Sequence, residues 1–107
     1  MSKQHKPQYD PIVCKSGLKM SVQASSTHYC DPQDDTGPYT SVEAGYPTEP
    51  VPELIPFIDG MSNDFTKSVY AWVPLELVRQ VIFVRGGMES GELPPHVETQ
   101  IHLEKIE

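Results

Sequence analysis

Residues 19–25 read Lys19-Met20-Ser21-Val22-Gln23-Ala24-Ser25. Apolar and polar side chains alternate along this stretch, and they alternate again along residues 40–46. A period of two residues is typical of a strand that buries one face and exposes the other. The two stretches therefore predict two strands of one small sheet, connected by the polar residues 26–38.

Two further segments extend the predicted sheet. Residues 12–14 are apolar, and the turn-forming residues 15–17 separate them from the first alternating stretch, so the two segments predict a β-hairpin. Residues 68–73 are apolar on both faces, as in a strand that is covered on both sides.

One helix is expected over residues 74–85. Leu75, Val78 and Ile82 recur at helical spacing, and Pro74 is suited to a first helical turn because it lacks only an amide that would be unpaired there. Gly86-Gly87 then supplies a stop signal. The predicted fold class is α+β: a loop-rich domain with a small antiparallel sheet of about four strands and one main helix packed on one face.

The chain of 107 residues has the size of one domain. Residues 1–8 are polar and predict a disordered N-terminal arm. Residues 9–87 contain the predicted α+β domain, with a proline-rich connector over residues 47–56. Residues 88–107 are expected to form a polar linker and a strand-like tail, in which residues 97–103 alternate and could pair with the domain or with a second subunit of a homo-oligomer.

The formal net charge of −7 limits the classes of partner. Nucleic-acid and anionic-membrane binding both need clustered cations, so neither is expected. No apolar stretch is long enough to span a bilayer, and the first ten residues lack the apolar segment of a secretory signal. We expect a cytoplasmic protein with reduced cysteines, although a disulfide between the predicted hairpin and the loop remains an alternative.

The loop 26–38 carries residue types that are used in three kinds of site chemistry. A metal could be held by Cys14, His28 and Cys30, but the chain lacks the paired spacing of zinc sites. The aspartates of residues 31–37 lack the spacing of an EF-hand calcium loop, so turn formation is their expected role. No nucleophile, phosphate-binding or dinucleotide-binding motif is present, and we expect no enzyme and no cofactor.

The remaining candidate is a protein-binding face. The loop is acidic, and aromatic residues that would serve as binding anchors occur in it and in the predicted strands. Packing against the helix is the structural alternative for Tyr70 and Trp72. The candidate partner-binding residues are His28, Tyr29, Asp31, Asp34, Asp35, Tyr39, Tyr70 and Trp72.

A resemblance bears on the setting. Residues 17–25 (GLKMSVQAS), 37–47 (GPYTSVEAGYP) and 69–74 (VYAWVP) resemble a family of small uncharacterised proteins encoded by tailed bacteriophages and prophages. The resemblance covers residues 9–87 and excludes the extension from Met88. It implies the cytoplasm of a host bacterium and an accessory role in interfering with host defence, without implying a fold or a mechanism.

These observations lead to a functional expectation and a rival. The expectation is a non-catalytic accessory protein that binds a host protein, or inhibits one, through the acidic loop and its neighbouring aromatics. The rival is a small-ligand binder for a nucleotide signal, with a pocket at a subunit interface. Its only candidate cations outside the termini are Lys15, Lys19, Lys67, Arg79 and Arg85.

Overall fold

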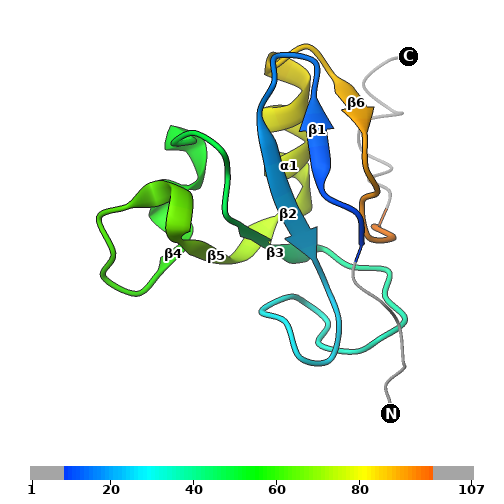
Figure 1. Ribbon diagram of the computed structural model, residues 1–107. Coiled ribbons are helices and arrows are strands. Elements are labelled where there is room, and N and C mark those ends of the chain that lie inside the picture. The colour runs from blue at the N-terminus through cyan, green and yellow to red at the C-terminus, as the bar shows by residue number, and fades with distance from the viewer. Residues whose placement is uncertain (1–8, 98–107) are drawn as a thin grey trace, which may run out of the picture.

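The computed structural model describes residues 9–97. These residues form a six-stranded sheet of order β4-β5-β3-β2-β1-β6, in which every pairing between strands is antiparallel. One α-helix, α1, lies behind β1 and β2 in the view of Figure 1. The elements in chain order are β1 (Ile12–Cys14), β2 (Lys19–Gln23), β3 (Ser41–Gly45), the 3-10 helix η1 (Pro52–Phe57), β4 (Ile58–Asp59), the 3-10 helix η2 (Phe65–Lys67), β5 (Val69–Pro74), α1 (Leu75–Val84) and β6 (Met88–Ser90).

The predicted hairpin is confirmed. Ile12 lies opposite Met20, and the Cys14 amide donates to the Leu18 carbonyl across the turn. Gly17 adopts a φ of 105°, which is open to glycine but strained for residues with a Cβ. The apolar side chains of the alternating stretch are buried, so its period of two places them in the core as expected.

The α-helix is confirmed and closely coupled to the sheet. It begins directly after β5, and the Leu75 amide donates to the Thr40 carbonyl beside β3. Its buried side chains are Leu75, Val78, Val81 and Ile82. A two-point contact between the Arg85 guanidinium and the Glu53 carboxylate, with both N–O distances 3.1 Å, fastens its end to η1.

The sheet has two strands more than the expected four. β4 pairs with β5, and β6 pairs with β1 inside the segment where a polar linker was expected. All three side chains of β6 are exposed, so no hydrophobic pattern marks this strand. Its pairing depends on backbone hydrogen bonding and on Gly91, where a Cβ would come within 2.3 Å of the Pro11 carbonyl oxygen.

The ordered chain therefore continues beyond residue 87. The Tyr39 amide donates to the Pro95 carbonyl, and the Val97 amide donates to the Tyr39 carbonyl. The expected strand over residues 97–103 lies, apart from Val97, outside the described residues, as does the expected N-terminal arm.

Candidate functional site

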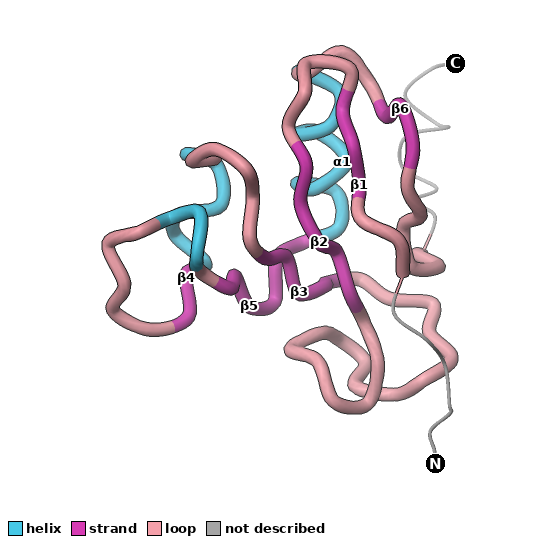
Figure 2. The backbone as a smooth tube through the Cα atoms, in the orientation of Figure 1, coloured by secondary structure: helices cyan, strands magenta, loops and turns pink. Residues whose placement is uncertain are grey.

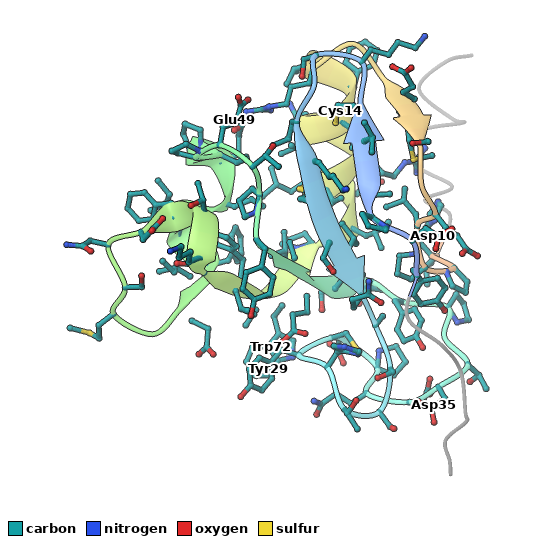
Figure 3. The ribbon with its side chains drawn as sticks, viewed as in Figure 1. Asp10, Cys14, Tyr29, Asp35, Glu49 and Trp72 are labelled. Atoms are coloured by element: carbon teal, nitrogen blue, oxygen red, sulfur yellow. The ribbon has the colours of Figure 1, made fainter. Side chains whose placement is uncertain are left out.

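Two aromatic rings stack on the surface where the acidic loop, residues 26–38, meets the sheet. The ring centroids of Tyr29 and Trp72 are 4.9 Å apart, and the ring planes are inclined by 30°. Tyr29 is 40% exposed and Trp72 is 50% exposed. We refer to these two residues as the aromatic pad; Figure 3 shows them next to each other at one side of the loop.

A β-bulge places Trp72 on the outside. Val42 of β3 lies opposite Val73, but Ala44 lies opposite Tyr70, so β5 carries one extra residue between these pairs. Trp72 has a φ of +50° within this bulge, and its amide donates to the Tyr29 carbonyl at 3.1 Å. A non-glycine residue in the left-handed region costs about 1–3 kcal/mol, so the surrounding structure must hold it there.

The bulge corrects the expected pattern of β5. Strict alternation would put Tyr70 and Trp72 on one face, yet Tyr70 is fully buried and Trp72 is exposed. The extra residue shifts the side chains beyond it to the opposite face. The sequence carries no glycine at this position that would have signalled the bulge.

The acidic loop is held mainly by its own polar groups; Figure 2 shows it as a long segment without helix or strand between β2 and β3. The Asp34 Oδ1 accepts hydrogen bonds from the Thr36 and Gly37 amides, and these bonds lower the pKa of Asp34. The Asp35 Oδ1 accepts from the Ser26 amide at 2.8 Å. Asp34 and Asp35 thus shape the loop, as expected of turn aspartates, while Asp31 is exposed.

Two of the candidate binding residues lie in the core. Tyr39 and Tyr70 are fully buried, and their hydroxyls donate to the carbonyls of Asp34 and Phe65 at 2.7 and 2.6 Å. Burial raises the pKa of Tyr39 to about 12. These tyrosines support the loop and the sheet from beneath, so neither can form part of an exposed binding surface.

His28 connects the acidic loop to β3. Its Nδ1 lies 2.7 Å from the Ser25 Oγ, and its Nε2 lies 3.8 Å from the Glu43 carboxylate. Glu43 was not a candidate from the sequence, because only the fold brings it to a residue fifteen positions away.

The stretch of chain that contains the acidic loop is strongly acidic. Residues 20–66 contain no lysine or arginine and eight carboxylates. This stretch provides the whole acidic loop, β3 and β4. A single sign of charge over such a length creates a local potential that attracts cations.

The three candidate metal ligands do not converge. Cys14 lies in β1, while Cys30 lies in the acidic loop and donates to the carbonyls of Ser25 and Pro32. Both cysteines are buried and unpaired, and burial raises the pKa of each thiol. Across residues 9–97, no three His, Cys, Asp or Glu side chains are grouped to hold a metal ion.

Among the helices within residues 9–97, none is long and apolar enough to cross a bilayer.

Comparison with known proteins identifies no relative of this chain. No family model matches the chain, and no curated protein and no solved structure is significantly similar to it.

Proposed function

We propose that this protein is a non-catalytic binder of a host bacterial protein and that it acts in the host cytoplasm. The aromatic pad and the acidic groups around it form the binding face. The expectation that binding inhibits a defence protein depends on the resemblance to phage-encoded proteins alone.

The observation that carries the proposal is the exposed aromatic pair, in which the strained Trp72 stacks on Tyr29. Folding gains little from a half-exposed ring, while a positive φ on tryptophan costs free energy. An exposed tryptophan with a strained backbone is understandable where its ring contributes to binding, because tryptophan and tyrosine are among the most frequent binding hot spots.

The chemistry of the face favours a basic partner surface. An arginine or lysine of the partner could lie over the face of the pad, where cation–π attraction contributes about 0.5–2 kcal/mol. The carboxylates of residues 20–66 would speed the encounter and orient it. We therefore expect binding to weaken as ionic strength rises.

The nucleotide-binding alternative has less support. A phosphate site needs converging cations, and Arg85 is already engaged by Glu53. Lys15 lies in the β1–β2 turn and Lys19 begins β2, whereas the acidic loop follows the opposite end of β2. Three of the five candidate cations are thus either paired with a carboxylate or placed at the hairpin end of β2.

Affinity capture with matched variants tests the proposal. The full-length chain is immobilised and exposed to bacterial lysate at low and moderate salt, with Trp72→Gly and Tyr46→Gly as parallel baits. Tyr46 is a matched control, since it is also exposed and also has a positive φ, of 52°, but it stacks on no other ring within residues 9–97.

The expected result is one stoichiometric, salt-sensitive protein partner that the wild type and Tyr46→Gly retain and Trp72→Gly loses. Equal capture of the partner by all three folded baits would show that Trp72 is not part of the binding face. Empty capture by the wild type would instead favour a small ligand, to be sought by thermal shift with nucleotides.

A further inference from the structure

A hollow of about 310 Å³ lies beside β2, and neither residue of the aromatic pad lines it. Its volume falls in the range of small-molecule sites. The lining residues come from the chain before β1, from β2 and from the segment after β3: Pro11, Lys19, Met20, Ser21, Tyr46 and Thr48. Met20 is buried in the core with the apolar side chains of α1, which lies behind β2 in Figure 1. Because side chains alternate along a strand, Lys19 and Ser21 point away from α1.

Thr48 is joined to the start of β2 by two hydrogen bonds. Its amide donates to the Lys19 carbonyl at 2.9 Å, and its Oγ1 accepts from the Lys19 amide at 3.0 Å. A hydroxyl can accept and donate at the same time. Since the Thr48 oxygen accepts from an amide, its own proton remains for a different acceptor.

Ser21 presents a second hydroxyl proton in the same way. The Gln23 side chain is oriented by Tyr9, whose amide donates to Oε1 and whose carbonyl accepts from Nε2, both at 2.8 Å. The Gln23 Nε2 also donates to the Ser21 Oγ at 3.1 Å. The orientation of the amide makes Ser21 the acceptor of this bond, so its own proton remains for a different acceptor.

The Lys19 ammonium has no ion-pair partner among the described residues. The two ion pairs within residues 9–97 are those of His28 with Glu43 and of Arg85 with Glu53. Lys19 is exposed and is the last lysine or arginine before the acidic stretch of residues 20–66. The hollow thus combines one cation with two hydroxyl donors, and such a set of donors suits a carboxylate.

Tyr46 adds an aromatic side chain to the hollow. It is 60% exposed, and its φ of +52° is strained for a residue with a Cβ. Folding gains little from a ring in this position, whereas a ligand could pack against it. Pro11 precedes β1 and Tyr46 follows β3, and these strands flank β2, so the two apolar side chains lie on opposite sides of the hollow.

We propose that this hollow binds a small organic acid, in which one carboxylate is attached to a flat apolar group. The Lys19 ammonium and the hydroxyls of Ser21 and Thr48 bind the carboxylate, while the apolar group lies against the Tyr46 ring. A single cation matches a single negative charge. Because the pad is not part of this site, the inference does not depend on the proposed protein-binding function.

Nuclear magnetic resonance of the full-length chain, titrated with hydrocinnamate, tests the proposal. Hydrocinnamamide is the control ligand, since it has the same apolar group without the charge. We expect saturable shifts of the amide resonances of residues 19–21 and 46–48 with the acid, and about tenfold weaker binding of the amide.

Matched variants locate the contacts of the acid. Lys19→Met should weaken its binding about tenfold, whereas Lys15→Met, in the adjacent turn, should leave it unchanged. Tyr46→Gly relieves the backbone strain and should also weaken binding. Trp72→Gly should bind the acid as the wild type does, because it changes only the pad.

Four results would each overturn the proposal. An absence of shifts at residues 19–21 and 46–48 would mean that the hollow is not a site for such acids. Equal binding of the acid and the amide, or unchanged binding in Lys19→Met, would mean that the charge is not recognised. Tighter binding of a tripeptide that ends in phenylalanine would assign the hollow to the terminal carboxylate of a peptide.

Discussion

Two pairs of aromatic residues in the same region of the chain differ in burial: Tyr39 and Tyr70 are in the core, whereas Tyr29 and Trp72 are on the surface. The first two are fully buried, and each hydroxyl is satisfied by a backbone carbonyl. The second two stack against each other in solvent, and one of them has a strained backbone. Residue type therefore does not distinguish a structural aromatic from a candidate binding residue here; burial and backbone conformation do.

The contrast separates stability from function. Removing a buried tyrosine deletes packing and leaves a carbonyl without its donor, so it should strongly destabilise the protein. Removing the pad should leave the fold largely intact and abolish binding. The predictions below test whether this separation holds, starting with the largest effect.

Tyr70→Ala should lower the free energy of unfolding by about 3–5 kcal/mol, because it empties a fully buried site. Trp72→Ala should cost less than about 1.5 kcal/mol, because its ring is half exposed. Denaturant unfolding of both variants measures the difference. Similar losses would mean that Trp72 is part of the core.

Gly37→Ala should lower the free energy of unfolding by about 2–4 kcal/mol, adding backbone strain to overpacking. Gly37 has a φ of +69°, and a Cβ there would come within 2.7 Å of the buried Tyr39 ring. Gly60→Ala is the control, since it also has a positive φ, of 101°, but no atom of the described residues lies within 4 Å of its added Cβ. An equal loss in both variants would show that backbone strain alone, and not contact with Tyr39, sets the cost.

The buried Tyr39 hydroxyl should make stability depend on pH in the alkaline range. Its pKa is raised to about 12 from the ordinary value of 10.0, so the protonated form is favoured by folding. This contribution, about 3 kcal/mol, is present below pH 10 and is lost as the pH rises through about 12. The pKa of Tyr39 is measured by titrating the near-ultraviolet absorbance of tyrosinate in the wild type and in Tyr39→Phe and subtracting the two curves. If the subtracted curve has its midpoint near pH 10, the hydroxyl of Tyr39 is not buried.

Trp72→Gly should be more stable than Trp72→Ala by about 1 kcal/mol, the reverse of the usual order in a strand. Both variants lose the stacked ring, but only glycine accommodates a φ of +50° without strain. Thermal unfolding of the two variants provides the comparison. If alanine is the more stable, the strain at the bulge is smaller than we infer.

Periodicity predicted most of the fold. The alternating stretches became β2 and β3, residues 12–14 became β1, and the apolar spacing after Pro74 became α1. Each of these elements buries a regular pattern of side chains, so local sequence carries the information. β4 and β6 were missed because they are short edge strands of two and three residues, with hardly any buried side chain to mark them.

The candidate site was less predictable. The acidic loop and Trp72 could be selected from the sequence, but which aromatic side chains are buried and which are exposed could not. Tyr70 and Trp72 were expected on the same face of β5, but one extra residue in the strand places them on opposite faces. Glu43 comes close to His28 only because the fold brings β3 next to the acidic loop. A bulge and a register are properties of two paired strands, and neither strand encodes them alone.

The order of apolar and polar residues was thus sufficient to determine the α+β class, the hairpin, the helix and the acidic character of the face. Tertiary pairing determined which aromatics became core and which became surface. The physical reason is that the burial of a periodic face depends on the local order of residues. The bulge that exposes Trp72 instead depends on how β5 pairs with β3, and it is held by a hydrogen bond that the Trp72 amide donates to the Tyr29 carbonyl of the loop.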